Sequence, residues 1–136
     1  MYEMKPNEIN IELTNVCSMA CSFCPLSSIS RPNGFMAKDI FYKTVNEIIE
    51  KDYTNLVLPF LMGESLLHKK WYEYISYLTN KCSEKKIETS LVTNGLQLLN
   101  ENIEKLSSTK LNSIYISCQQ FNEAGYKDRN IKQNIS

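Results

Sequence analysis

Neither sign of charge is in excess in this sequence of 136 residues, which contains 15 basic and 15 acidic side chains. A nucleic-acid-binding domain usually carries a basic stripe and a solvating tail carries an acidic run, so this balance argues against both. The longest apolar run, at residues 56–62, is too short to cross a bilayer. No apolar segment of a secretory signal follows the first five residues. We therefore expect a soluble cytoplasmic protein that binds neither nucleic acid nor membranes.

Internal repeats, low-complexity tracts and linkers rich in proline or glycine are also missing from the sequence. Hydrophobic residues make up 43% of the chain, which is enough to bury a core and unlike the composition of a disordered tail. The length is typical of one domain. We therefore expect residues 1–136 to form a single domain.

The five cysteines are the most informative residues. An odd number of cysteines without a secretory signal argues against a disulfide framework. Three of them, Cys17, Cys21 and Cys24, lie within eight residues, whereas Cys82 and Cys118 stand alone. Clustered thiolates in a reducing compartment more often hold a metal than form disulfides. We therefore expect a metal site at residues 17–24.

Short apolar runs alternate with stretches of helical periodicity. Four strands are predicted, at residues 9–13, 56–61, 87–93 and 114–118. Four helices are predicted. The first two lie at residues 38–51 and 67–82. The third is capped by Asn100 and carries Ile103 and Leu106, and the fourth starts near Asn122. Pro59 is awkward inside the second strand because proline cannot donate to a strand ladder. Residues 14–36 are predicted to form a long loop.

Strands that alternate with helices predict βαβ units and therefore a parallel sheet of the α/β class. In such folds chemistry collects at the carboxyl ends of the strands. The unusual polar residues of this chain follow the predicted strands, at the cysteine loop, Gly63-Glu64-Ser65, Thr93-Asn94-Gly95 and Ser117-Cys118-Gln119. The sequence therefore predicts one functional site at this edge of the sheet.

The spacing of the three cysteines leaves two kinds of metal centre open. A structural zinc site needs four protein ligands, and the fourth would have to be His68, Cys82 or Cys118. An iron–sulfur cube tolerates three cysteines better, because its fourth iron can take a ligand that is not protein. The spacing favours the cluster over zinc.

The residues around the cysteines resemble a known family. Glu12-Leu13-Thr14-Asn15, followed by Cys17, Cys21, Phe23, Cys24 and Pro25, resembles the cluster-binding loop of the radical S-adenosylmethionine (SAM) enzymes. The resemblance implies that Cys17, Cys21 and Cys24 bind a [4Fe–4S] cluster whose open iron is chelated by SAM. It also implies reductive cleavage of SAM to a 5′-deoxyadenosyl radical, which abstracts hydrogen from a peptide or small-molecule substrate. Phe23 would lie near the adenine.

Further matches follow in the order of the family's motifs, from residue 9 to residue 129. Met62-Gly63-Glu64-Ser65 resembles the Gly-Gly-Glu-Pro segment, which implies that Gly63 and Glu64 contact the SAM amino group. Thr93-Asn94-Gly95 resembles the end of the family's third strand. The resemblance further implies that Ser117 contacts the ribose, that Gln119 stands where an acidic residue is common, and that Arg129 lies near the SAM carboxylate.

The segment Arg31-Pro32-Asn33-Gly34-Phe35-Met36 resembles the signature of the subgroup that often carries a C-terminal SPASM or related auxiliary-cluster domain. The family fold implies a parallel-stranded partial (βα) barrel, of which this chain would supply only about four βα units. We therefore expect a truncated, N-terminal part of the core, with the terminal strand left unpaired and the auxiliary domain missing.

The family also implies an external electron donor of the flavodoxin or ferredoxin type. Two other functions stay open, namely a zinc-binding interaction module and a simple iron–sulfur electron carrier without catalysis.

Overall fold

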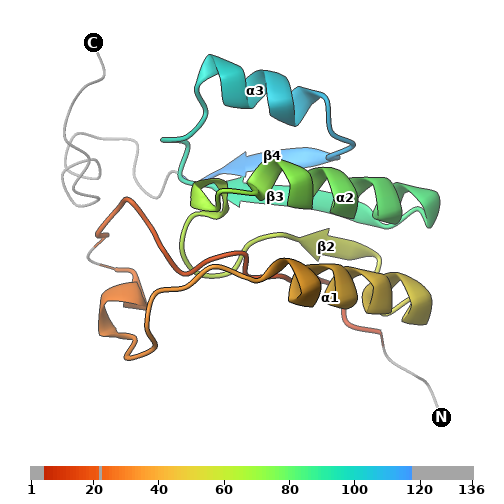
Figure 1. The fold of residues 1–136 in the computed structure, drawn as a ribbon, viewed down its shortest axis with the longest axis horizontal. Helices are drawn as coiled ribbons and strands as arrows, with labels where there is room; N and C mark the ends of the chain where they lie inside the picture. The colour runs from red at the N-terminus through yellow and green to blue at the C-terminus, as the bar shows by residue number, and fades with distance from the viewer. Residues whose placement is uncertain (1–4, 22, 118–136) are drawn as a thin grey trace.

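The computed structural model describes residues 5–21 and 23–117 and arranges them in alternating strands and helices (Figure 1). In this part of the chain the strands are β1 (Ile9–Asn10), β2 (Leu56–Leu58), β3 (Glu88–Thr93) and β4 (Ser113–Ile116). They form one sheet in the order β1-β2-β3-β4, and each neighbouring pair is parallel. The predicted α/β class with parallel strands is confirmed.

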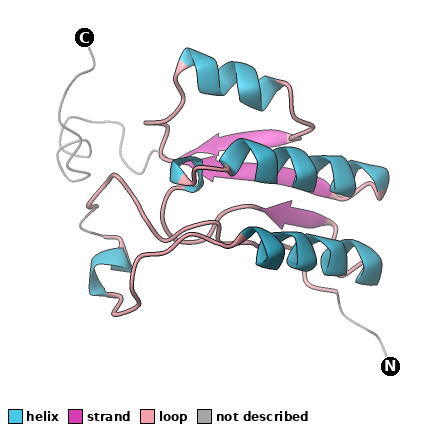
Figure 2. Cartoon of the chain, in the orientation of Figure 1, coloured by secondary structure: helices cyan, strands magenta, loops and turns pink. Residues whose placement is uncertain are grey.

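The helices connect successive strands. They are α1 (Lys38–Lys51), α2 (Trp71–Glu84) and α3 (Asn100–Ser107), with the short 3₁₀ helices η1 (Pro25–Ser28) and η2 (Ser65–Leu67). Figure 2 shows α1 and α2 side by side along the sheet, and the two helices are in contact. The long loop that contains η1 extends from the end of the sheet where the strands finish (Figure 1).

The core lies between α1, α2 and the strands. Phe41, Val45 and Ile48 recur at helical spacing on one face of α1, and all three are buried. The ring of Phe41 stacks on Tyr74 of α2 with 4.2 Å between centroids and 7° between planes. A stacked pair of this kind is worth about 1 kcal/mol beyond the area that it buries. The α1–α2 contact therefore depends on aromatic side chains whose positions are set by helical periodicity.

A second group of buried side chains joins α2, β3 and α3, and consists of Leu66, Trp71, Ile75, Leu91 and Leu106. Leu106 is the buried residue of α3, whereas Ile103, which was expected on the same apolar face, is 49% exposed. Asn100 is not the cap of this helix but its first residue. Leu99 occupies the N-cap position and makes no side-chain capping hydrogen bond.

Other predicted elements are also shorter than the sequence suggested. β1, expected over residues 9–13, ends at Asn10. β2 ends at Leu58, directly before Pro59, because proline has no N–H to continue the ladder. The apolar stretch at residues 67–82 is not one helix, since Leu67 belongs to η2 and α2 begins at Trp71. Between them His68 accepts a hydrogen bond at Nδ1 from the N–H of Lys70, at 3.0 Å. The helix expected from Asn122 lies outside the described residues.

Strand β4 is an outer strand of the described sheet. Its side chains Ile114, Tyr115 and Ile116 are 41%, 60% and 54% exposed. In the described part of the chain these apolar groups are left uncovered, as was expected for the terminal strand. An edge of this kind can pair with further chain.

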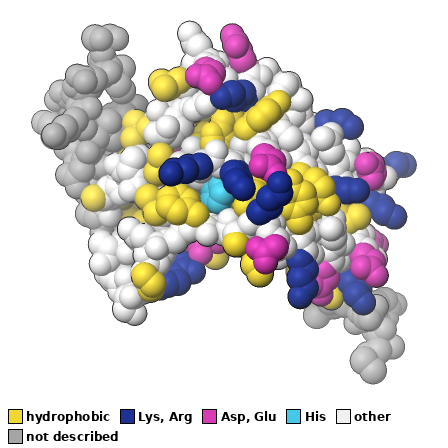
Figure 3. Space-filling view, in the orientation of Figure 1, with side chains coloured by type: hydrophobic (Ala, Val, Ile, Leu, Met, Phe, Trp, Pro, Cys, Tyr) yellow, Lys and Arg dark blue, Asp and Glu magenta, His cyan; other side chains and the backbone are white. Residues whose placement is uncertain are grey.

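The molecular surface agrees with the charge balance of the sequence. On the face seen in Figure 3, basic and acidic side chains are interspersed over the helices, and neither sign forms a continuous stripe. Among the residues that the structure describes, no helix is both long enough and apolar enough to traverse a bilayer.

Burial separates Cys82 from the cysteines of the loop and gives a first prediction. Cys82 is fully buried in α2, and burial raises the pKa of its thiol to about 11. At pH 8 the thiol is therefore protonated as well as enclosed, and thiols react as thiolates. We expect iodoacetamide to alkylate the half-buried Cys17, Cys21 and Cys24 of the native metal-free protein much faster than Cys82. Peptide mass spectrometry measures each site separately.

Unfolding in guanidinium chloride is the control for this experiment, because Cys82 should then react as fast as the loop cysteines. Equal alkylation rates in the native protein would contradict the buried position of Cys82.

Candidate metal centre at the carboxyl ends of the strands

Two segments close the cysteine loop at its base, and we call residues 12–15 together with residues 31–36 the loop base. The Thr14 hydroxyl donates to the Gly34 carbonyl at 2.6 Å. The Asn15 amide donates to the Pro32 carbonyl at 3.0 Å and accepts from the Gly34 N–H at 2.7 Å. The Met36 N–H donates to the Leu13 carbonyl at 2.8 Å. The two motifs that flank the cysteines in the sequence therefore bind each other.

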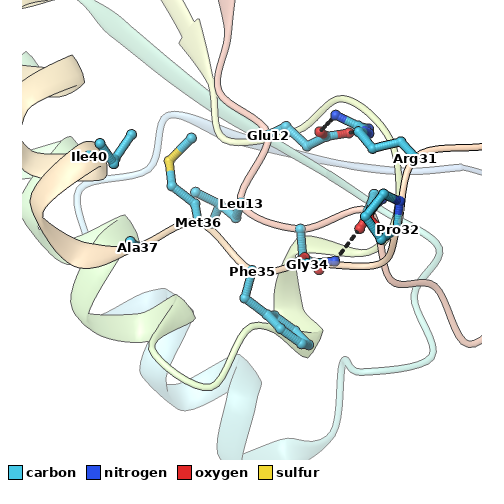
Figure 4. Close-up of a pocket in the computed structure, with 11 residues that line it drawn as sticks. Glu12, Leu13, Arg31, Pro32, Gly34, Phe35, Met36, Ala37 and Ile40 are labelled. Atoms are coloured by element: carbon cyan, nitrogen blue, oxygen red, sulfur yellow. Dashed lines mark hydrogen bonds and ion pairs between the residues drawn. The ribbon is translucent and has the colours of Figure 1, made fainter.

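An ion pair strengthens the loop base (Figure 4). Two guanidinium nitrogens of Arg31 lie 3.0 Å and 2.7 Å from the two carboxylate oxygens of Glu12, a bidentate arrangement. The hydrogen bond from Arg31 to Glu12 raises the pKa of the guanidinium. Glu12 also accepts a hydrogen bond from the N–H of Met62 at 3.3 Å, so it links the loop base to the segment after β2.

Gly63 brings the segment after β2 into direct contact with the backbone before Cys17. It has a φ of +76°, and a Cβ at this position would lie 2.5 Å from the Thr14 carbonyl oxygen and 2.7 Å from that of Val16. The next residue, Glu64, donates its N–H to the Val16 carbonyl at 2.8 Å. Only glycine combines this φ with this close approach.

Glu64 connects the same segment to the end of β3. Its side chain is 1% exposed, and its carboxylate accepts from the Leu66 N–H at 3.2 Å and from the Asn94 N–H at 2.8 Å. The Thr93 hydroxyl lies 3.0 Å from both carboxylate oxygens. A buried carboxylate is stable when such donors replace water. Glu64 therefore fixes the ends of β2 and β3 relative to each other.

A cavity of about 270 Å³ lies between the cysteine loop and these strand ends. Its lining includes seven residues that the sequence singled out, namely Cys17, Cys21, Phe23, Cys24, Gly63, Glu64 and Ser117. Phe23 is 53% exposed, and the Ser117 N–H is held by the Thr93 carbonyl at 2.8 Å. The structure thus brings together segments that lie far apart in the sequence. Gln119, Arg129 and Cys118 lie outside the described residues.

The three cysteines of the loop line this one cavity. Within residues 5–21 and 23–117, no three His, Cys, Asp or Glu side chains are grouped closely enough to hold one metal ion. A zinc ion needs its sulfur ligands about 2.3 Å from a single centre, whereas the cysteines of an iron–sulfur cube bind separate irons.

Two of the three residues considered as a fourth zinc ligand are engaged elsewhere. His68 is 5% exposed, and its Nε2 lies 3.0 Å from the Met36 carbonyl while Nδ1 accepts from Lys70. Cys82 is buried on α2. His68 is therefore buried just before α2, whose N-cap residue is Lys70.

Some residues that line the cavity had not been singled out from the sequence, namely Met19, Phe60 and Val92. Thr93 and Asn94 had been placed at the predicted site, because they end a parallel strand, but no role had been assigned to them. Phe60 follows Pro59 and carried no comparable signal.

The sheet, the loop and the cavity define a class of protein, a parallel α/β domain with a cysteine-rich site where its strands end. A sequence profile described as the Radical SAM superfamily matches residues 11–136. The chain therefore belongs to the radical SAM superfamily, whose cofactors are a [4Fe–4S] cluster and SAM. A search of curated proteins found no match.

Solved structures show the same fold. A crystal structure of BtrN in complex with AdoMet and 2-DOIA aligns with a TM-score of 0.73 at 18% identity, covering 92% of this chain and 56% of BtrN. A crystal structure of Streptococcus suis SuiB bound to S-adenosylmethionine aligns with a TM-score of 0.68 at 21% identity, covering 93% of this chain and 30% of SuiB. The expected partial (βα) barrel is thus confirmed, and the chain spans 56% or less of these proteins.

The close approach at Gly63 predicts a large effect of a small substitution. Gly63→Ala would place a methyl group against two carbonyl oxygens at a positive φ, so we expect it to destabilise the fold by at least about 2 kcal/mol. Gly34→Ala in the loop base is the matched control. A Cβ there meets nothing within 4 Å, so the stability should change by less than about 1 kcal/mol. Denaturant unfolding of the metal-free chain measures the free energy of unfolding of both variants. If the two variants lost similar stability, the close contact at Gly63 would be refuted.

The buried carboxylate gives a second prediction for this site. Glu64→Gln replaces one acceptor oxygen by an NH₂ group facing N–H and O–H donors, so we expect a loss of about 1–3 kcal/mol in the free energy of unfolding. Glu104→Gln on α3 is a control at an exposed position, where the change should stay within about 0.5 kcal/mol. Chemical denaturation monitored by circular dichroism compares them. A Glu64→Gln protein as stable as the control would show that the network contributes nothing.

Proposed function

We propose that this chain binds a [4Fe–4S] cluster through Cys17, Cys21 and Cys24 and uses it for radical SAM chemistry. When bound, these cofactors supply reductive cleavage of SAM to a 5′-deoxyadenosyl radical that abstracts hydrogen from a substrate. The observation that carries this proposal is the single cavity shared by the three cysteines and by residues from the carboxyl ends of β2, β3 and β4. Its lining combines the three cysteines with the polar residues Glu64, Thr93, Asn94 and Ser117.

The other lining residues support the proposed SAM contacts. Gly63 and Glu64 would receive the SAM amino group, Ser117 the ribose, and Phe23 would flank the adenine. Gln119 would contact the SAM ribose, and Arg129 would lie near the SAM carboxylate. The protein's part in the chemistry is to orient SAM and to keep water away from a reactive radical.

The substrate and the electron donor also belong to the proposal. BtrN was crystallised with 2-DOIA, and SuiB was crystallised with a precursor peptide, SuiA. They support a small molecule or a peptide as the substrate class of this chain. We assign electron delivery to an external protein of the flavodoxin or ferredoxin type.

We also assign residues 1–136 to the N-terminal part of a radical SAM core. Two observations support this assignment. The chain covers 56% of BtrN, and the apolar side chains of β4 are left uncovered within the described residues.

Anaerobic reconstitution of the 136-residue chain with iron and sulfide tests the proposal. We expect a brown protein with the four irons of one cluster per chain, whose reduced electron paramagnetic resonance (EPR) spectrum changes when SAM is added. Cys17→Ala, Cys21→Ala and Cys24→Ala should each abolish or strongly reduce iron uptake because each removes one of three ligands. Cys82→Val is the matched control and should load normally, since Cys82 is enclosed in the core.

The other outcomes decide between the remaining functions. A loaded protein whose spectrum ignores SAM would favour a simple electron carrier. A colourless protein that holds one zinc tightly would favour a zinc-binding interaction module and would refute both iron-based functions.

A further inference from the structure

The side chain of Asn94 connects the end of β3 to the first cysteine of the loop. Its Nδ2 lies 3.8 Å from the Sγ of Cys17, at the long end of the range for a sulfur acceptor, which is a larger atom than oxygen. The backbone N–H of Met19 lies 3.4 Å from the same sulfur. Cys17 therefore accepts from one donor within its own loop and from one donor on a different element.

The orientation of the Asn94 amide is fixed by its surroundings. Its Oδ1 accepts the N–H of Leu96 at 2.9 Å, and its backbone N–H donates to the buried Glu64 carboxylate at 2.8 Å. Turning the amide over would place an NH₂ group against the Leu96 N–H and an oxygen lone pair against the Cys17 sulfur. Both changes are unfavourable, so the NH₂ group faces the sulfur.

A donor in this position has an electrostatic effect on a cluster bound at Cys17. Reduction adds one electron, and part of the added negative charge resides on the thiolate sulfurs. An N–H dipole directed at such a sulfur stabilises the reduced form more than the oxidised form, and hydrogen bonds to the sulfurs are among the factors that set cluster potentials. Asn94 is half-buried, so water screens this dipole incompletely.

We propose that Asn94 is a positioning residue that raises the reduction potential of the cluster by donating a hydrogen bond to Cys17. This inference rests on the proposed function, because it requires a cluster at Cys17. It also gives Glu64 a second part, since the Glu64 carboxylate holds the backbone from which Asn94 projects.

Two substitutions distinguish the two hydrogen bonds of the Asn94 side chain, the one donated to Cys17 and the one accepted from Leu96. Asn94→Asp keeps an oxygen for the Leu96 N–H but replaces the NH₂ group by a second carboxylate oxygen facing the sulfur. Asn94→Ala removes both groups. The control is Asn102→Ala, because Asn102 donates its side-chain N–H to the Gln97 carbonyl at 2.8 Å in the connection after β3. Within the described residues it forms no hydrogen bond with the cysteine loop.

The measurement is a potentiometric titration of the reconstituted proteins without SAM, followed by EPR of the reduced cluster. We expect Asn94→Ala to lower the equilibrium constant for reduction about tenfold, or about 59 mV for a one-electron couple. Asn94→Asp should lower it further, because it adds a negative charge beside the sulfur. Iron content should match the wild type in both variants, and Asn102→Ala should leave the potential unchanged.

The results distinguish this inference from the function on which it rests. If the wild-type chain takes up no iron, the proposed function fails first. If the wild type loads and responds to SAM but both Asn94 variants keep its potential, the proposed function stands and the role of Asn94 is refuted. Loss of the cluster from both variants, with folding intact, would also refute it, because retention rather than tuning would then be the role of Asn94.

Discussion

The hydrogen bonds of the loop base are the constraint on which the rest of the site depends. A loop of the length of residues 16–30 could place its three thiols in many ways, but Thr14 and Asn15 hold its two ends together through backbone groups of Pro32 and Gly34. Closing the ends limits the conformations between them. The loop then lies over the carboxyl ends of the strands, where Gly63 meets it backbone to backbone.

The buried residue Glu64 connects the cysteine loop to the sheet. Glu64 donates its N–H to Val16 beside Cys17 and accepts from Leu66, Thr93 and Asn94 with its side chain. The buried charge is tolerated because hydrogen-bond donors surround it. The position of the carboxylate is specific because those donors come from two different strand ends. The same residue thus supports the cysteine loop, the wall of the cavity and the orientation of Asn94.

The sequence predicted the parts of the fold that depend on periodicity and on proline or glycine. The helix at residues 38–51 has the predicted bounds because Phe41, Val45 and Ile48 define one face. The stretch at residues 67–82 was predicted less well, since spacing alone could not show that Leu67 belongs to a separate turn.

For the site, the motifs identified the cysteines, Gly63, Glu64 and Ser117, and the fold places them around one cavity. The pairing of the Glu64 carboxylate with Thr93 could not be predicted, because it depends on how two crossover connections align in space.

The closed loop base also bears on the order in which the protein is assembled. A zinc finger folds only when its metal binds, and the metal-free peptide is unfolded. Here the side-chain bonds that close the loop base are made by Thr14, Asn15, Glu12 and Arg31, and no cysteine takes part in these bonds. The closure of the loop base therefore does not depend on any metal ligand, so iron binding is not needed to hold the two ends of the cysteine loop together.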